Sequence, residues 1–199
     1  IGEVVKYFDK IAEETVDATK LSRSRDPFRK ALGKTYLRYR GELKEHNRID
    51  FAHLQLFFLE MMRQKGVGKK IKSTIKYVMV DEYQDTNYIQ EQMILALGGG
   101  SGNICVVGDE DQALYRFRGA TVRNILEFPT ILKKTKRIVM TTNYRSHPKI
   151  VAAYDSFMSE HDWDSDDERV FRFDKTIKPD TKKKHPSVDS VLRITGKTK

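Results

Sequence analysis

Two acidic residues close a short apolar run near the middle of the 199-residue chain. The run covers residues 77–80 (YVMV), and Asp81 and Glu82 follow it directly. At the end of a strand, one carboxylate can hold a magnesium ion through water while a second orients and deprotonates an attacking water. The pair therefore fits nucleoside triphosphate hydrolysis. By itself it is weak evidence, because Asp-Glu after a strand is also a common turn or helix cap.

Two more polar clusters follow apolar runs further along the chain. Residues 108–112 follow the run 104–107, and residues 142–146 follow the strand-like residues 138–140. Short apolar strands that alternate with helices indicate a parallel sheet covered on both faces, and ligands bind at the loops after such strands. We therefore expect the three clusters to converge on one edge of one sheet.

Helical spacing of apolar residues dominates the first third of the chain. Asp26-Pro27 is typical of a helix start, and a further helix is expected to begin near Asp50 and to end before Gly66. Later helices are expected over residues 88–97 and around residues 122–128. The single cysteine, Cys105, lies in an apolar run and is expected to be a small core residue.

The net charge of +9 is distributed unevenly. Residues 1–76 carry +8, residues 77–168 carry −6 and residues 169–199 carry +7. Carboxylates around a metal and flanks that face phosphates would give this pattern, and so would an ordinary solvated surface. No apolar run approaches the roughly 20 residues of a membrane-spanning helix, and no signal sequence is visible, so we expect an intracellular protein.

The three polar clusters also resemble motifs of a known family. Residues 80–87 (VDEYQDTN) resemble the Walker B segment of superfamily 1 DNA helicases of the PcrA/UvrD/Rep type. Residues 107–120 resemble the family's next motif, residues 142–146 (TNYRS) resemble the one after, and the order and spacing fit. Upstream, Asp50-Phe51 and Leu54 resemble the family's DFxxL helix, with Ala52 and His53 where carboxylates are usual.

The resemblance implies an α/β fold, a RecA-like parallel sheet with flanking helices, preceded by an N-terminal helical segment. Residues 1–46 would be a helical insert subdomain and residues 47–150 part of the first motor domain. Residues 151–199 would begin the second motor domain.

The resemblance also implies roles for single residues. Asp81 would hold magnesium, Glu82 would be the general base for water, and Gln112 would sense the γ-phosphate of ATP. Arg145 would stabilise charge on the transferring phosphoryl group, a task that suits its planar and permanently charged guanidinium. Tyr144 would stack on adenine. The alternatives are a surface salt bridge for Arg145 and a core position for Tyr144.

Aromatic and arginine residues alternate over Tyr115, Arg116, Phe117 and Arg118. Rings for base stacking and cations for the backbone are how single strands are bound without sequence preference, but a half-buried strand has the same alternation. The resemblance favours contact with single-stranded DNA through Tyr115, Phe117 and Arg118, and it adds Asn143 to the DNA-binding residues.

No phosphate-binding loop of the form GxxxxGK[ST] is present in the chain. Residues 33–35, 66–69 and 196–198 have parts of its pattern, but Phe28, Arg63 and Val191 stand where the first glycine is required. The chain also stops short of the family's C-terminal motor motifs. We therefore expect this fragment alone to be inactive.

For the full-length protein the resemblance implies an ATP-dependent DNA helicase or translocase. It would couple Mg-ATP hydrolysis to 3′ to 5′ movement on single-stranded DNA, with duplex junctions as partners, in the cytoplasm at the nucleoid. DNA repair is one pathway that such a motor would serve. Two alternatives stay open: a non-catalytic nucleic-acid-binding or regulatory protein, and the motor part of a helicase-nuclease.

Overall fold

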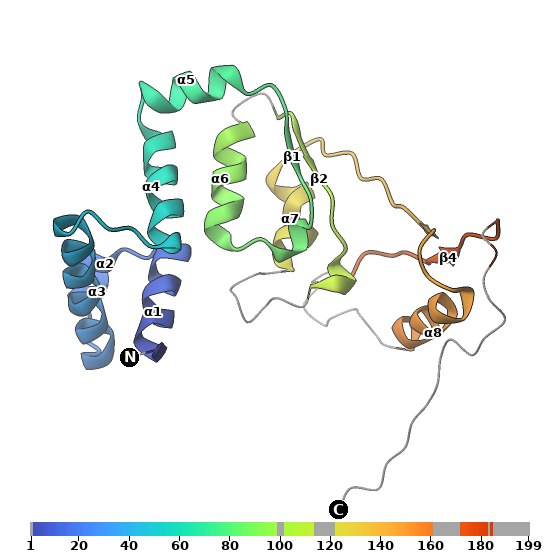
Figure 1. Cartoon of the computed structure of the whole chain (residues 1–199), viewed down its shortest axis with the longest axis horizontal. Coiled ribbons are helices and arrows are strands. Elements are labelled where there is room, and N and C mark those ends of the chain that lie inside the picture. Colours follow the sequence, from blue (N-terminus) through green and yellow to red (C-terminus); the bar gives the residue numbers. More distant parts are fainter. Residues whose placement is uncertain (1, 99–101, 114–121, 161–171, 183, 185–199) are drawn as a thin grey trace, which may run out of the picture. The chain divides into compact units, whose positions relative to one another are not determined.

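A computed structural model describes residues 2–98, 102–113, 122–160, 172–182 and 184. The chain divides into two compact units, Ile1–Phe128 and Pro129–Lys199, and each is described by itself (Figure 1). The described residues are mostly helical and contain two small parallel sheets, so the fold is of a mixed helix-and-strand type. Among these residues, none of the helices combines the length and apolar composition needed to cross a bilayer. The proposed division at residues 46 and 150 stays a prediction.

Helices make up most of the first unit. Asp26 accepts a hydrogen bond from the Arg29 amide and Asp50 accepts one from the His53 amide, so both predicted helix starts are confirmed as capped N-termini. The sequence did not predict two of the short helices, α2 and α5. The helices are α1 (Gly2–Glu13), α2 (Ala18–Ser22), α3 (Pro27–Glu45), α4 (Phe51–Arg63), α5 (Val67–Thr74) and α6 (Tyr88–Gly98).

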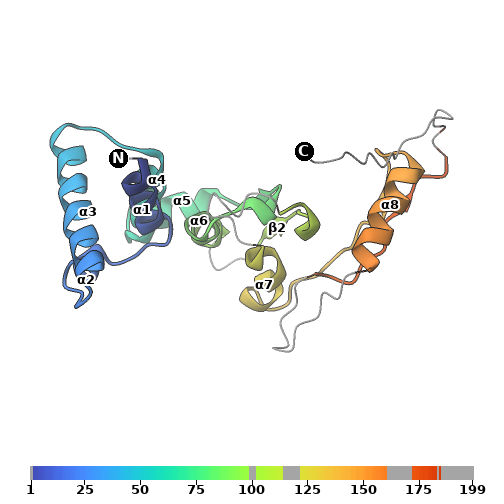
Figure 2. The same cartoon turned by 90° about the horizontal axis from the view of Figure 1, so that it is seen from below.

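Two apolar clusters form the core of this unit, and α1 contributes to both. One cluster joins α1, α4 and α6, with Ala12, Leu59 and Ile89 among its buried residues. The other joins α1 to α2 and α3, with Phe8 and Tyr36 in edge-to-face contact. Figure 2 shows α2 lying against α3, next to α1. α1 therefore connects α2 and α3 to α4 and α6.

A buried polar network ties α3 to the start of α4. The Asp50 carboxylate accepts from the His53 backbone amide at 2.7 Å and from the His53 ring Nδ1 at 2.9 Å. Tyr39 donates to the other Asp50 oxygen at 2.7 Å, and the Tyr36 hydroxyl lies 3.1 Å from His53 Nε2. Tyr36 and His53 are each 1% exposed. This network holds the N-terminal helices on α4 by directional bonds as well as by apolar contact.

The first unit contains a two-stranded parallel sheet of β1 (Val78–Val80) and β2 (Ile104–Val106). Side chains alternate between the two faces of a strand. Val78, Val80, Ile104 and Val106 are half-buried, and α6 packs against both strands. The opposite face holds Met79, which is 79% exposed, and the exposed Cys105.

Two expectations about this sheet were therefore wrong for the described residues. Cys105 is exposed and is not a core residue. The sheet is also open, since Met79 on the same face is exposed. An apolar run predicts a strand, but it does not show which of the two faces a helix covers. The larger RecA-like sheet stays a proposal.

α7 (Arg123–Ile131) confirms the helix expected around residues 122–128 and spans the boundary between the units. The second unit contains β3 (Thr142–Asn143), α8 (Pro148–Ser159) and β4 (Lys178–Pro179), and β3 pairs with β4 in parallel. The expected strand at residues 138–140 was wrong. Ile138 and Met140 are 75% and 74% exposed, and no described strand pairs with them.

Candidate nucleotide-binding site

The loops after β1 and β2 meet at one edge of the first sheet. The register pairs Val80 with Val106, so both strands end at the same level. The Val107 amide donates to the Val80 carbonyl at 2.8 Å, and the Tyr83 amide donates to the Val107 carbonyl at 2.9 Å. The first two polar clusters therefore come together at the carboxyl ends of parallel strands, as the sequence predicted, and this is where α/β proteins bind ligands.

Asp81 and Glu82 are both exposed at this edge. The Glu82 amide donates to Asp81 Oδ1 at 2.9 Å, which closes the turn out of the strand. Glu82 has a left-handed backbone, with φ 51° and ψ 42°, although it is not glycine. Such conformations cost about 1 kcal/mol or more and cluster at functional sites. The turn therefore holds two neighbouring carboxylates at the sheet edge in a conformation that the rest of the structure must stabilise.

A buried amide connects the two loops. Gln84 is 1% exposed; its Nε2 donates to Glu82 Oε2 at 2.7 Å, and its Oε1 accepts from the Asp109 amide at 3.1 Å. An amide side chain can donate to a carboxylate through its NH₂ and accept from a backbone N–H through its oxygen. Gln84 therefore fixes the Glu82 carboxylate relative to the second loop. The sequence prediction gave Gln84 no role, although it lies inside the VDEYQDTN motif.

The second loop extends this network to Gln112. Asp109 Oδ2 accepts from Gln112 Nε2 at 2.6 Å, and Asp109 Oδ1 accepts from the Asp111 amide at 3.2 Å. A side chain at Gly108 would lie 2.6 Å from Gln84 Oε1, so only glycine permits this close approach. Glu82, Gln84, Asp109 and Gln112 thus form a continuous hydrogen-bonded chain, which we call the loop network.

Buried aromatic and polar residues support the loop network from below. Tyr83 is fully buried; its ring contacts Phe128 edge to face, and its hydroxyl donates to Glu91 Oε1 at 3.3 Å. Burial is the main cause that raises the pKa of Glu91, and the hydrogen bond from Tyr83 partly opposes it. Asn124 of α7 donates to the Thr86 carbonyl at 3.1 Å. The segment after β1 is therefore bonded to α6 through Glu91 and contacts α7 through Asn124 and Phe128.

The third polar cluster forms a closed loop in the second unit. Asn143 Oδ1 accepts from the amides of Arg145 and Ser146 at 2.9 and 2.8 Å. Tyr144 is 69% exposed, which contradicts its alternative placement in a core, and Arg145 is exposed as well. Because Asn143 uses its carbonyl oxygen to shape the loop, a DNA contact would fall to its amide NH₂. The meeting of this loop with Asp81 and Glu82 stays a prediction.

Comparison with known proteins identifies the family of this arrangement. The family model of the UvrD/REP helicase N-terminal domain matches residues 2–133. This chain belongs to the UvrD/Rep helicase family. It is 34% identical over 151 residues to the ATP-dependent DNA helicase UvrD1 of Mycobacterium bovis, covering 71% of this chain and 19% of that protein. It is 32% identical to the ATP-dependent DNA helicase PcrA of Leuconostoc citreum, covering 67% and 18% of the two chains. It is also 34% identical to the ATP-dependent DNA helicase Rep of Buchnera aphidicola, covering 63% and 19%.

The chain thus spans about a fifth of the length of these UvrD/Rep relatives. The matched residues 2–133 contain the loop network, whereas the loop of Tyr144 and Arg145 lies beyond them. The predicted DNA-contact residues Tyr115, Phe117 and Arg118 lie outside the described residues.

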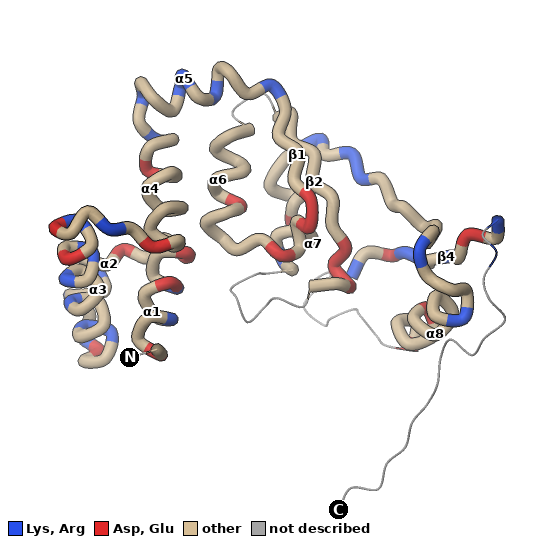
Figure 3. Tube along the Cα trace, in the orientation of Figure 1, with Lys and Arg blue, Asp and Glu red and all other residues tan. Residues whose placement is uncertain are grey.

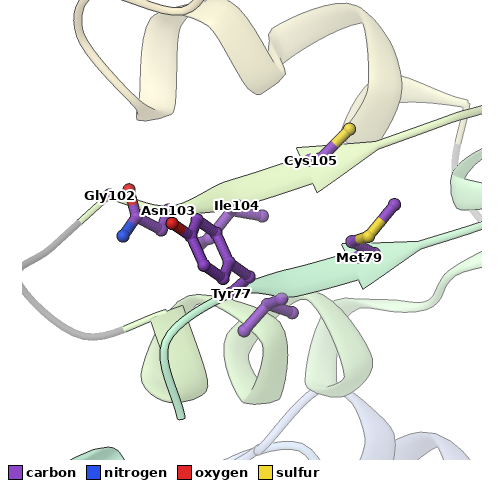
Figure 4. Close-up of a pocket in the computed structure, with 7 residues that line it drawn as sticks. Tyr77, Met79, Gly102, Asn103, Ile104 and Cys105 are labelled. Atoms are coloured by element: carbon purple, nitrogen blue, oxygen red, sulfur yellow. The ribbon is translucent and has the colours of Figure 1, made fainter.

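A pocket of about 320 Å³ lies away from the loop network (Figure 4). It opens where the two strands begin, and Tyr77, Met79, Asn103 and Cys105 are among its lining residues. No predicted site residue lines it. Within the described residues no three His, Cys, Asp or Glu side chains gather as a metal site. A magnesium ion at Asp81 would then take most of its ligands from water and phosphate, as this ion commonly does.

Proposed function

We propose that this chain supplies the magnesium-and-water half of the ATP site of a DNA-translocating motor. In the full-length protein this motor would couple ATP hydrolysis to 3′ to 5′ movement on single-stranded DNA and act at duplex junctions. The observation that carries the proposal is the loop network, which joins a carboxylate at the end of one strand to an amide at the end of the next. Membership of a family of ATP-dependent DNA helicases supports the same conclusion.

Asp81 fits a magnesium ligand, because an exposed carboxylate at the end of a strand is a hard oxygen donor. When bound, magnesium would neutralise charge on the β- and γ-phosphates of ATP. Glu82 would accept a proton from the attacking water. Gln84 would be a positioning residue, since it donates to Glu82 Oε2 and would leave Glu82 Oε1 to accept the proton.

The loop network also provides a route from nucleotide to DNA. Gln112 Nε2 donates to Asp109 Oδ2 at 2.6 Å. A γ-phosphate that recruited the Gln112 amide would break this bond and change the start of the segment that leads to Tyr115, Phe117 and Arg118. Tyr144 and Arg145 would complete the site from the second unit by stacking on adenine and contacting the γ-phosphate.

The main test uses the full open reading frame that encodes this chain. Glu82→Gln should lower kcat of ATP hydrolysis about 10²- to 10⁴-fold, the usual contribution of a general base, with unchanged affinity for single-stranded DNA. Glu45→Gln removes an exposed carboxylate of α3 and is the matched control, expected to leave kcat unchanged. Near wild-type turnover of the Glu82 variant would contradict the assignment. If the wild-type protein does not hydrolyse ATP, the non-catalytic alternative is favoured. If it also cleaves DNA, the helicase-nuclease alternative is favoured.

Gln84→Leu in the same protein tests the loop network itself. It removes both hydrogen bonds while keeping a similar volume, so kcat should fall and KM for ATP should change little. Gln84→Glu keeps the acceptor but places a second carboxylate beside Glu82, and should be at least as damaging because like charges repel. If both variants turn over like the wild type, the network does not position the base.

The isolated chain of residues 1–199 should show neither appreciable ATP hydrolysis nor unwinding of DNA, because it contains no phosphate-binding loop. DNA-stimulated, magnesium-dependent hydrolysis above background would refute this. The chain should bind labelled single strands in fluorescence anisotropy. Phe117→Ala and Arg118→Ala should each weaken that binding, and wild-type affinity in both variants would remove this segment from the DNA track.

A further inference from the structure

The segment from the end of α4 to the start of β1 carries positive charge that the proposed ATP chemistry does not use. Between Glu60 and Asp81 the sequence has no acidic residue. Six basic side chains lie in this interval and all are exposed. In Figure 3 the charged residues on α5 and on its two flanks are all blue, the colour of Lys and Arg. We name the six residues the α5 basic face: Arg63, Lys65, Lys69, Lys70, Lys72 and Lys76.

Half of these residues lie within the helix itself: Lys69, Lys70 and Lys72 belong to α5, and the others flank it. Lys69 and Lys72 are three positions apart, the spacing that places side chains on the same side of a helix. The positive charge therefore forms a stripe along α5 and its two flanks.

Carboxylates do not neutralise this stripe. In the part of the chain that the structure describes, no ion pair includes a residue of the α5 basic face. Some cations on other helices of the unit do have such partners: Lys10, Arg38 and Arg123 each pair with a glutamate four positions later. Uncompensated like charges repel one another, so an anionic partner that bound here would relieve this repulsion.

Tight packing holds the α5 basic face in place. Gly68 is buried against the backbone of Met62, and a side chain at this position would overlap the Met62 carbonyl oxygen. At the other end, Asn103 Nδ2 donates to the Lys76 carbonyl at 3.1 Å. Both ends of the segment are thus attached to the folded unit, so the backbone that carries the stripe is held in place.

The α5 basic face is separate from the loop network. Lys76 precedes β1 and Asp81 follows it, and five extended residues span roughly 16 Å. The cations therefore lie at the opposite end of the strand from the carboxylates. They would contact a different part of any bound polyanion from the part that reaches the ATP site.

We propose that the α5 basic face binds the phosphate backbone of duplex DNA. The eight residues of α5 hold Lys69, Lys70 and Lys72 over about 12 Å, a length over which a duplex presents roughly seven phosphate charges. Binding of single strands uses exposed aromatic rings; residues 63–76 contain none, and one exposed ring, Tyr77, follows Lys76 directly. The inference rests on the proposed function, because it assigns a surface to the duplex at which the motor would act.

The test compares two variants of the 1–199 chain that lose the same charge. The face variant carries Lys69→Ala, Lys70→Ala and Lys72→Ala. The control variant carries Lys10→Ala, Arg38→Ala and Arg123→Ala. Far-UV circular dichroism and urea unfolding first confirm that both are folded. Anisotropy then measures affinity for a blunt duplex of about 20 base pairs between about 50 and 200 mM salt, a range over which phosphate contacts change affinity strongly.

The face variant should bind the duplex at least about tenfold more weakly than the control near 100 mM salt. Its plot of log K against log salt should be shallower by about 2.7, since each lost phosphate contact removes about 0.9. Equal affinity of the two variants would overturn the inference. An equal loss of single-strand and duplex affinity in the face variant would also overturn it. Displacement of the duplex by polyglutamate at equal charge would overturn it too, because that result would indicate an acidic protein partner.

The two DNA proposals fail separately. If Phe117→Ala and Arg118→Ala leave single-strand binding intact while the face variant loses duplex binding, the proposed single-strand track is wrong and the α5 inference holds. If only single-strand binding responds to its own variants, the α5 inference is wrong and the track holds.

Discussion

Tyr36→Phe tests whether the buried network between α3 and α4 stabilises the first unit. The substitution removes one hydroxyl and leaves the ring that packs against Phe8. The lost group lies 3.1 Å from His53 Nε2, and both residues are 1% exposed. An ionised Asp50 can only accept, so His53 Nδ1 carries a proton, and in the neutral ring Nε2 then accepts from Tyr36. Burial raises the pKa of Tyr36 to about 12, so its hydroxyl remains a donor at neutral pH.

The expected magnitude follows from what is left behind. Without the hydroxyl, His53 Nε2 is a buried acceptor without a donor, which costs about 1–3 kcal/mol. Tyr39→Phe is the matched control. It also removes a tyrosine hydroxyl, but its acceptor Asp50 is 28% exposed at the side chain and water can replace the bond. We expect about 0.5–1 kcal/mol for the control, and a clearly larger loss for Tyr36→Phe.

Urea unfolding followed by far-UV circular dichroism measures both variants. Tyr36→Phe should lower the midpoint with an unchanged slope, and thermal unfolding should shift by about 2–4 °C for each kcal/mol in a chain of this size. A loss below about 0.5 kcal/mol for Tyr36→Phe, or a loss no greater than that of Tyr39→Phe, would show that the buried bond to His53 contributes little. A changed slope would instead indicate that the variant alters the unfolded or native ensemble.

Two further predictions concern packing and pH. Gly68→Ala should destabilise the chain by about 1–3 kcal/mol in urea unfolding, because the added Cβ would overlap the backbone of α4. Gly41→Ala is the control: space around Gly41 is open, so this substitution should be neutral or stabilising. Equal effects of the two substitutions would contradict the close approach of Gly68 to α4. Glu91→Gln should raise the unfolding temperature at pH 8, because burial raises the pKa of Glu91 and the folded state therefore disfavours its charge. This advantage should disappear as the pH falls through the unfolded value of 4.5, and a constant difference across that range would refute the burial argument.

Local signals in the sequence predicted the helices better than the strands. Asp26 and Asp50 mark helix starts because a cap acts on amides only three residues away. A strand depends on a partner that is distant in sequence, so the apolar residues 138–140 were assigned wrongly. Cys105 was misplaced for a related reason, since an apolar run does not reveal which face of the strand is covered.

The candidate site shows the same division. The positions of Asp81 and Glu82 at the end of β1 followed from a single apolar run. The role of Gln84 did not, because its second hydrogen bond reaches Asp109, 25 residues further along the chain. Only the parallel register of β1 and β2 brings these residues together. Residue types and motif spacing therefore locate the chemistry, while the groups that fix its geometry require the fold.

The departure from the family's DFxxL helix has a structural explanation. Ala52 and His53, which the resemblance places where carboxylates are expected, are both buried, at 6% and 1% exposed. A carboxylate at position 53 would lie beside Asp50, where two like charges would each raise the other's pKa. The histidine instead donates to Asp50 and accepts from Tyr36. In this chain the start of α4 therefore serves as an attachment point for the N-terminal helices, and the substitution leaves the loop network after β1 untouched.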